Sequence, residues 1–170
     1  MTDRRSVLTA AGASLLAALG WLRPDPASAA GNSAAEHFEV TKAEAEWRRQ
    51  LSPGQYNVLR EHGTERPFSS PLNGEHRKGT FACAGCDLLL FSSETKFDSG
   101  TGWPSFYQPL DNAVATTEDR SYMMLRTEVH CRRCGGHFGH VFDDGPKPTG
   151  LRYCMNGLAL TFKPAASSAS

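Results

Sequence analysis

The sequence predicts an α+β protein whose core is mainly β. Two helix-forming segments come first in the chain, and short β-favouring segments bounded by Gly, Pro, Asn or Asp follow them. Helices and strands separated along the chain in this way favour an antiparallel sheet or a small barrel. No repeat with a period of about 20 to 50 residues is present, which argues against a repeat architecture. At 170 residues the chain has room for one domain with a substantial core.

The charge balance gives no support to a role at nucleic acids or membrane surfaces. Eighteen basic residues balance eighteen acidic residues, and no run of like charge exceeds three residues. Binding to a polyanion or to an anionic surface requires a concentrated basic patch. We therefore expect no nucleic-acid partner.

The first 30 residues have the pattern of an export signal. Arg4 and Arg5 precede an apolar run from Val7 to Leu22, and the Ala-Ser-Ala-Ala segment at 27–30 provides an Ala-x-Ala cleavage pattern. The paired arginines indicate the twin-arginine type of signal, which carries folded cargo. The apolar run is shorter than the roughly 20 residues of a spanning helix. We expect a periplasmic or exported protein without stable membrane insertion.

The rest of the chain divides into a linker, one domain and a tail. Small polar residues at 31–39 predict a flexible linker, the domain covers 40–165, and 166–170 is expected to be a disordered tail. The domain opens with a helix predicted from Thr41 as N-cap, with Glu44 completing a capping box, to about Leu51.

A second helix and then a series of strands complete the predicted domain. Ser52 and Pro53 give the second helix a cap and a first-turn proline, and Gly63 is expected to end it. Residues 64–78 are rich in turn formers and predict an irregular loop. The β-type segments are 80–82, 88–91, 122–129, 138–142 and 153–162.

One of the five cysteines, Cys154, has no partner in the sequence pattern. Because strand side chains alternate, Arg152, Cys154 and Asn156 are expected on one face, with Tyr153 and Met155 on the other. A cation beside a thiol favours the thiolate, which is the nucleophilic form. The alternative is a buried structural cysteine, because free cysteine is among the most buried residue types.

The other four cysteines form two Cys-x-x-Cys pairs. Cys83 and Cys86 are separated by 44 residues from Cys131 and Cys134. Two such pairs can place four thiolates around a structural zinc ion. Disulfides are the alternative in an exported protein, and a redox-active pair is a third interpretation. Export in the folded state favours zinc, because the metal can be loaded in the reducing cytosol.

Two histidines follow the second cysteine pair. His137 and His140 are surplus to a closed four-cysteine site, and either histidine alone is more often an ordinary hydrogen-bonded residue. Gly139 between them permits a β-bulge that brings both to one side. With Cys154 as nucleophile and Asp144 as an orienting carboxylate, they form a plausible catalytic constellation.

Several motifs occur in a fixed order along residues 40 to 164. They are the segments 51–53 (LSP), 63–68 (GTERPF), 96–106 (KFDSGTGWPSF), 137–142 (HFGHVF), 144–146 (DGP) and 152–157 (RYCMNG). Together with the two cysteine pairs, these motifs resemble the methionine-R-sulfoxide reductases of the B type, the MsrB family.

The resemblance implies an α+β, mainly β fold of two antiparallel sheets in a barrel-like arrangement, with N-terminal helices. It also implies one structural zinc ion per chain, bound by the four paired cysteines. Cys154 would attack the sulfoxide sulfur, Arg152 would help to hold it as a thiolate, and Asn156 would support the site.

The resemblance assigns the remaining site residues to the substrate. His137 and His140 would bind and protonate the sulfoxide oxygen, with Asp144 orienting His140, and Trp103 would cover the methyl group. These roles fit the chemistry, because a sulfoxide oxygen leaves only after protonation. Sulfur–aromatic contacts are also favourable.

The implied function is repair of oxidised methionine in exported proteins under oxidative stress. Reduction of methionine-R-sulfoxide would leave Cys154 as a sulfenic acid. Many family members carry a second, resolving cysteine where this chain has Thr101. We therefore expect regeneration by an external reductant, either a thioredoxin-like protein or a small thiol, and a monomeric enzyme.

Two alternatives outside the family remain at this stage. An exported thiol–disulfide oxidoreductase would use one Cys-x-x-Cys pair and bind no metal. A zinc-stabilised binding module would keep its function when Cys154 is replaced. Zinc content and the number of free thiols distinguish the three interpretations.

Overall fold

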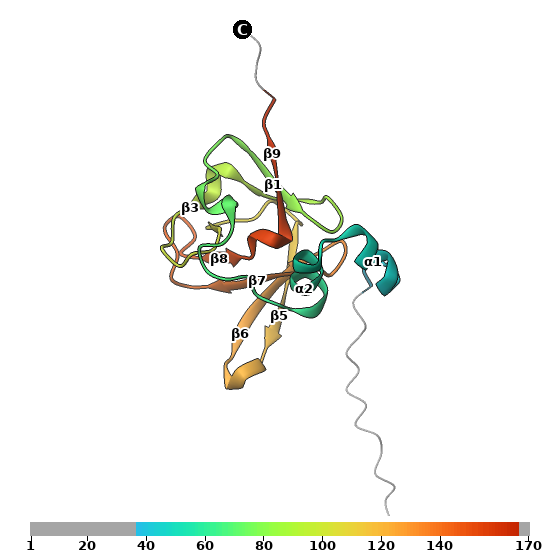
Figure 1. Ribbon diagram of the computed structural model, residues 1–170. Coiled ribbons are helices and arrows are strands. Elements are labelled where there is room, and N and C mark those ends of the chain that lie inside the picture. Colours follow the sequence, from blue (N-terminus) through green and yellow to red (C-terminus); the bar gives the residue numbers. More distant parts are fainter. Residues whose placement is uncertain (1–36, 167–170) are drawn as a thin grey trace, which may run out of the picture. The chain divides into compact units, whose positions relative to one another are not determined.

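The computed structural model describes residues 37–166. The predicted export signal, most of the predicted linker and residues 167–170 lie outside this range. Within it, two helices accompany nine strands in two antiparallel sheets, which confirms the predicted α+β, mainly β class (Figure 1). None of the helices in this range has the length and hydrophobicity needed to cross a membrane.

The first helix, α1 (Glu44–Gln50), begins later than its predicted cap. Its N-cap is Ala43, whose backbone N–H donates to the Glu46 carboxylate at 2.9 Å. The predicted capping box on Thr41 is wrong, because the Thr41 hydroxyl instead donates to the backbone oxygen of Phe38. A carboxylate in the first turn stabilises the helix N-terminus as a cap would.

The second helix, α2 (Pro53–Glu61), begins as the sequence predicts. Ser52 and Gln55 form a reciprocal capping box, with Pro53 in the first turn. The helix ends one residue earlier than expected, because His62 rather than Gly63 takes the left-handed conformation at the C-terminus, with φ 55°. This placement turns the His62 ring toward the sheet, where it lies 5.0 Å from the His137 ring.

Each sheet is antiparallel throughout. The three-stranded sheet has the order β2-β1-β9, and the six-stranded sheet has the order β3-β4-β8-β7-β6-β5. The three-stranded sheet consists of β2 (Leu89–Ser92), β1 (Gly79–Cys83) and β9 (Leu160–Pro164). The six-stranded sheet consists of β3 (Lys96–Phe97), β4 (Ser105–Phe106), β8 (Arg152–Met155), β7 (His137–Phe142), β6 (Arg126–Cys131) and β5 (Val114–Asp119).

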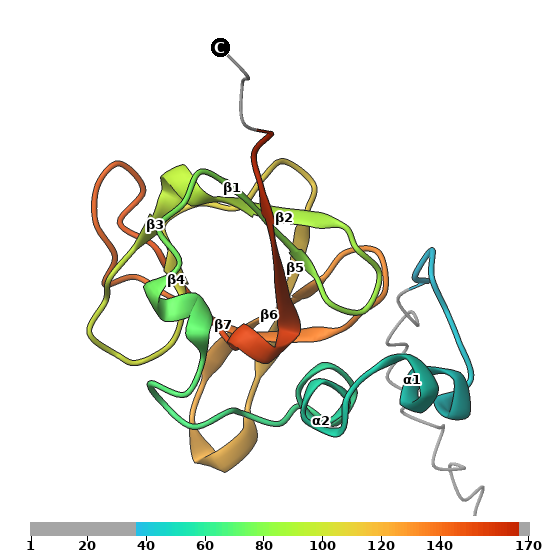
Figure 2. The ribbon, with the colours of Figure 1, turned by 45° about the horizontal axis from the view of Figure 1, so that its top comes forward.

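The described strands form no closed barrel, so the barrel-like arrangement is not confirmed. Figure 2 shows the strands of both sheets arranged about a common interior. The two sheets share no strand and no ladder of hydrogen bonds. The core lies between them instead. The Phe91 and Phe106 rings, one from each sheet, stack with centroids 4.3 Å apart, and Phe81 meets Phe106 edge-on at 4.9 Å. All three side chains are fully buried, and each aromatic pair adds about 0.5–1.5 kcal/mol beyond the burial of its area.

The predicted strand 153–162 is in fact two strands in different sheets. The chain leaves β8 at Asn156, passes through the 3-10 turn η4 (Gly157–Ala159) and enters β9. The buried Asn156 side chain accepts from the Glu65 backbone N–H and donates to the Phe138 carbonyl, both at 2.9 Å. These contacts fix the break, and the apolar pattern of the segment gives no sign of it.

The β5–β6 hairpin also differs from expectation. The predicted strand 122–129 begins only at Arg126, because Ser121–Met123 form a 3-10 turn, η3, in which Tyr122 has φ 54°. β5 was not predicted, since its Val-Ala-Thr-Thr-Glu-Asp sequence is largely exposed and lacks an apolar face. The hairpin projects away from the other strands (Figure 1). Two more 3-10 turns are η1 (Pro71–Gly74) and η2 (Ser93–Thr95).

Candidate active site and candidate metal centre

Cys154 lies in β8, between strands β4 and β7. It is directly opposite Ser105 on one side and His140 on the other. Its thiol is half-buried, and the Thr101 hydroxyl oxygen lies 3.8 Å from the sulfur. Met155 points the other way and is fully buried, which confirms the predicted alternation along this strand. Directly opposed residues have Cβ atoms about 5 Å apart, so Cys154 and His140 share a face within reach of one ligand.

The predicted irregularity at Gly139 is confirmed. The pairing register between β6 and β7 shifts between Val129 and His130, so that β7 carries one extra residue. The rings of His137 and His140 consequently approach to 5.7 Å between centroids. A Cβ atom on Gly139 would lie 2.1 Å from the Cys154 carbonyl oxygen, so only glycine permits this close strand approach.

Each histidine is held by a carboxylate from another strand of the same sheet. His137 donates from Nδ1 to Oε1 of Glu128 at 2.7 Å, and His140 donates from Nε2 to Oδ2 of Asp119 at 2.7 Å. Glu128 belongs to β6, and Asp119 ends β5. The carboxylates therefore fix both rings from the side of the sheet away from β8.

Asp144 does not orient His140, and that prediction is wrong. Its carboxylate forms a bidentate pair with Arg152, with Nε–Oδ1 and Nη2–Oδ2 distances of 2.8 Å. The Arg152 guanidinium also lies over the Phe142 ring at 4.4 Å. The hydrogen bond to Asp144 raises the pKa of Arg152, and the nearby Cys154 side chain makes a smaller contribution in the same direction. Arg152 in turn lowers the pKa of Asp144. Asp144 thus orients the cation next to Cys154.

The electrostatics decide which ring nitrogens carry protons. Burial lowers the pKa of His140, although Asp119 raises it. Burial raises the pKa of Glu128, but hydrogen bonds from His137 and His62 outweigh this effect and hold the pKa well below its ordinary value. Ionised carboxylates only accept hydrogen bonds. The protons therefore lie on Nδ1 of His137 and Nε2 of His140, which leaves the other nitrogen of each ring for a ligand.

A small cavity of about 150 Å³ joins most of the predicted site residues. The sequence placed Cys154, His140, Trp103 and Asn156 in one site, and all four line this cavity. His137 instead lines an adjoining cleft of about 620 Å³. His140 lines both the cavity and this cleft. The residues lining the cavity are Thr64, Trp103, Arg126, Gly139, His140, Phe142, Cys154 and Asn156.

Four charged residues that support the site were missed by the sequence analysis. Besides Glu128 and Asp119, they are Arg126, which donates to Asp119 at 2.6 Å and lines both cavities, and Glu65. The Glu65 carboxylate accepts from the backbone N–H groups of η4, and its carbonyl accepts from the Trp103 indole at 3.1 Å. Spacing along the chain gave no signal for these contacts, because each contact joins two separate elements.

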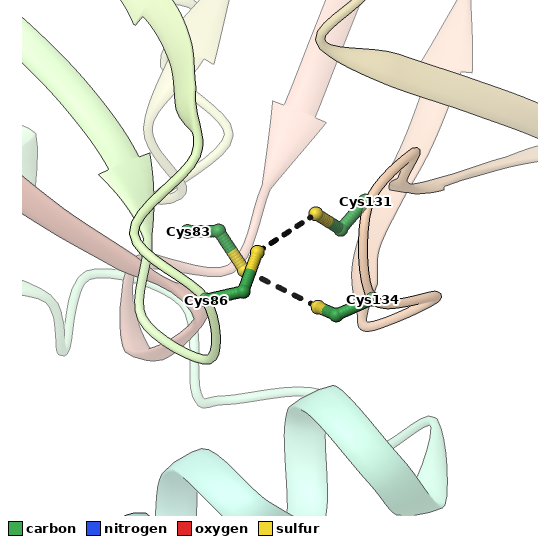
Figure 3. A group of neighbouring side chains, drawn as sticks. All are labelled: Cys83, Cys86, Cys131 and Cys134. Atoms are coloured by element: carbon green, nitrogen blue, oxygen red, sulfur yellow. Dashed lines mark hydrogen bonds between the residues drawn. The ribbon is translucent and has the colours of Figure 1, made fainter. Parts of the chain in front are cut away.

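The four paired cysteines converge at one point between the two sheets. Cys83 ends β1 and Cys131 ends β6, with Cys86 and Cys134 in the turns that follow (Figure 3). The sulfur atoms lie within 4.8 Å of one another, with closest approaches of 3.7 Å for Cys83–Cys134 and 3.5 Å for Cys86–Cys131.

These separations fit a metal ion and exclude disulfides. A tetrahedral ion with metal–sulfur bonds of about 2.3 Å places its ligands about 3.8 Å apart, whereas a disulfide requires about 2.05 Å. All four thiols are free. Hydrogen bonds from neighbouring thiols and burial raise the pKa of Cys83, so a buried cation is the group that would let all four ionise. The cluster can therefore hold a metal ion.

Comparison with known proteins agrees with this site. A SelR domain model matches residues 51–164. The chain is 55% identical over 127 residues to a peptide methionine sulfoxide reductase MsrB of Agrobacterium fabrum, covering 74% of this chain and 94% of that protein. It is 58% identical to a protein of the same name from Bradyrhizobium diazoefficiens, covering 74% and 91%, and 58% identical to one from Methanosarcina barkeri, covering 73% and 88%. The chain therefore belongs to the SelR domain family, together with the MsrB peptide methionine sulfoxide reductases.

Proposed function

We propose that this protein reduces methionine-R-sulfoxide in proteins to methionine, with Cys154 as the nucleophile. Family membership supports the reaction. The observation that carries the mechanism is the direct opposition of Cys154 and His140 across the β7–β8 pair, in one cavity with Trp103. A thiol, an imidazole and an aromatic wall are the three groups that this reaction requires.

The first half-reaction converts a thiol and a sulfoxide into a sulfenic acid and a thioether. The Cys154 thiolate attacks the sulfoxide sulfur, and the sulfoxide oxygen takes protons from the histidine side of the cavity. The oxygen is transferred to the Cys154 sulfur, and methionine leaves with its sulfur reduced by two electrons. Protonation is essential, because an unprotonated sulfoxide oxygen is a poor leaving group.

The carboxylates behind the histidines position this acid. Asp119 holds Nε2 of His140, so Nδ1 of that ring is directed to the substrate. Protonation of Nδ1 makes His140 the donor, and because burial lowers the pKa of His140, the ring gives this proton up readily, while the Asp119 carboxylate favours the short-lived imidazolium. His137, held by Glu128, supports the oxygen from the adjoining cleft.

The remaining residues hold the nucleophile and the substrate methyl group. Arg152, fixed by Asp144, places positive charge beside the thiolate. The oxygen and the nitrogen of the Asn156 side-chain amide each form a hydrogen bond to the backbone, so Asn156 stabilises the end of β8. Trp103, anchored through its indole N–H, presents an apolar face to the S-methyl group.

Chirality gives the decisive test of this function. Two strands and one aromatic wall form a single chiral cavity, so only one diastereomer can direct its oxygen to the histidines and its methyl group to Trp103. Mature protein with dithiothreitol should reduce a peptide containing methionine-R-sulfoxide and leave the S form largely unchanged. Chromatography of each diastereomer measures both rates. Equal rates for the two forms would rule out the proposed pocket.

The four-cysteine cluster holds one structural zinc ion per chain. Four thiolates close the coordination sphere of zinc, so the ion has no open position for substrate. One cysteine pair lies at the end of β1 and in the turn after it, and the other lies at the end of β6 and in the turn after it, so the ion would tie the three-stranded sheet to the six-stranded sheet.

Regeneration of Cys154 depends on an external reductant, which is a thioredoxin-like protein or a small thiol. With the paired cysteines bound to zinc, Cys154 is the one remaining cysteine of the sequence. A thiol condenses with the sulfenic acid to form a mixed disulfide and water, and a second thiol releases Cys154.

Thr101 makes this step testable. After one equivalent of substrate without reductant, wild-type Cys154 should gain one oxygen and form a dimedone adduct. Because the Thr101 oxygen lies 3.8 Å from the Cys154 sulfur, Thr101→Cys should instead give an internal disulfide after small adjustment to about 2 Å. Mass spectrometry distinguishes the gain of one oxygen from the loss of two hydrogens. A wild-type disulfide to a paired cysteine would contradict both this route and the zinc assignment.

The protein acts after export, where it repairs oxidised proteins. The support is the twin-arginine pattern at Arg4 and Arg5, followed by the apolar run and the Ala-x-Ala pattern. Replacing both arginines by lysine keeps the charge but removes the pair read by the export receptor. The precursor should then accumulate in the cytoplasm, as measured by immunoblots of cell fractions. Normal secretion of this variant would show that the general export route is used.

A further inference from the structure

A second group of metal-ligand side chains lies outside the cysteine cluster. It consists of His62 after α2, Glu128 in β6 and His137 at the start of β7. One ligand atom from each lies within 4.8 Å of the other two. We call this group the His-Glu-His cluster. Sequence spacing could not reveal it, because three separate elements supply its members.

The geometry of the cluster is close to that of a bound transition metal. Glu128 Oε1 lies 2.7 Å from Nδ1 of His137 and 3.2 Å from Nδ1 of His62. Ligands around a tetrahedral zinc ion with bonds of about 2.0–2.1 Å are about 3.3 Å apart. His137 and Glu128 are rigidly placed, with side chains 4% and 14% exposed, whereas His62 is 64% exposed and can adjust. The three ligand atoms therefore need to move apart only slightly to bind an ion.

The hydrogen-bond partners of Glu128 favour an ion here. Among the residues that the structure describes, Glu128 forms ion pairs with two imidazoles, those of His62 and His137. The other three acidic residues of the adjoining cleft are paired with arginines: Glu61 with Arg48, Glu118 with Arg120, and Asp119 with Arg126. Two imidazoles that have released their Nδ1 protons, together with one carboxylate, form a ligand set of the kind that binds zinc and leaves a coordination position open. The 620 Å³ cleft supplies space for water at that position.

We infer that the His-Glu-His cluster binds a divalent transition-metal ion and that the bound ion inhibits the reductase. Binding replaces the protons on Nδ1 of both histidines. The inhibitory part rests on the proposed function: an ion on Nδ1 of His137 breaks its hydrogen bond to Glu128 and prevents the ring from carrying a second proton. The sulfoxide oxygen at Cys154 then no longer has His137 as a source of protons.

Binding can be measured without catalysis. Tag-free protein already loaded with zinc at its cysteines is dialysed against buffered micromolar zinc, and the metal per chain is counted. A second equivalent should bind to wild type and to Cys154→Ser, which excludes the thiol as its ligand. His62→Ala and Glu128→Gln should each weaken it at least tenfold. The matched control His76→Ala removes an exposed histidine outside the cluster and should retain it. A second equivalent that survives His62→Ala, or no second equivalent in wild type, overturns the site.

Inhibition is measured in a single turnover, because dithiothreitol would itself bind zinc. The methionine formed per chain is followed with and without zinc, and each variant is compared with its own metal-free rate. Wild type should slow at least tenfold, and His62→Ala should not slow. An unchanged wild-type rate with two ions bound overturns inhibition and leaves the binding site standing. Absence of any turnover without added zinc would count against the proposed function, and the dialysis result would still decide the site.

Discussion

Replacing Cys154 by serine is expected to lower the rate of methionine-R-sulfoxide reduction by roughly 10³-fold or more. A serine hydroxyl stays protonated at neutral pH and is a far weaker nucleophile than a thiolate. Serine also cannot form the sulfenic acid that accepts the sulfoxide oxygen. The cavity residues around position 154 keep their own hydrogen bonds, so substrate binding should persist while turnover is lost.

The fold of this variant should be unchanged. Cys154 is only half-buried, and serine has nearly the same shape, so the free energy of unfolding should change by less than about 1 kcal/mol. Thr101→Val is a suitable control, since it removes the hydroxyl beside the sulfur but keeps the nucleophile. It should retain activity within about tenfold. Activity of Cys154→Ser close to that of wild type would require another nucleophile and would end the proposed mechanism.

Replacing Cys131 by serine is expected to remove the structural zinc and most of the stability of the domain. Structural zinc sites contribute about 10–16 kcal/mol of binding free energy in small domains. Native domains have a net stability of only about 5–15 kcal/mol. Cys131 is fully buried at the end of β6, and its cluster connects the two sheets. Loss of the ion therefore removes both a ligand set and the link between the sheets.

Metal analysis and circular dichroism during thermal unfolding measure this effect. Wild type should contain one tightly held zinc ion per chain, and Cys131→Ser should contain none and unfold at a much lower temperature. Cys154→Ser serves as the matched control, because it replaces a cysteine outside the cluster and should keep the ion. A Cys131→Ser variant that melts at the wild-type temperature would show that the thiols do not hold a structural metal.

Local features of the fold could be predicted because each depends on neighbouring residues. Ser52, Pro53 and Gln55 specify the start of α2 through contacts within one turn. The irregularity at Gly139 could likewise be predicted, because this glycine lies between two histidines that a bulge would bring together. The α1 cap was misplaced by two residues, since Thr41 and Glu44 have the same spacing as the contact actually formed by Ala43 and Glu46.

The break at Asn156 and the partners of the histidines could not be predicted. Asn156 bonds to the backbone of Glu65, which lies 91 residues earlier. His140 is 21 residues from Asp119, and Asp144, which lies much nearer to His140 in the sequence, pairs with Arg152 instead. A shift of one residue in the pairing of β7 would turn the histidines to the other face of the sheet, away from these carboxylates.

The sequence by itself determined the mainly β class, the two helices, the paired cysteines and the motifs centred on Cys154. Each of these is encoded in contiguous or regularly spaced residues, where local backbone geometry fixes what lies together. Only the tertiary structure decided that the sheets remain separate, that Glu128 and Asp119 hold the histidines, and that His62 joins Glu128 and His137. These contacts depend on strand register and on helix placement, which follow from packing the whole core and leave no local pattern in the chain.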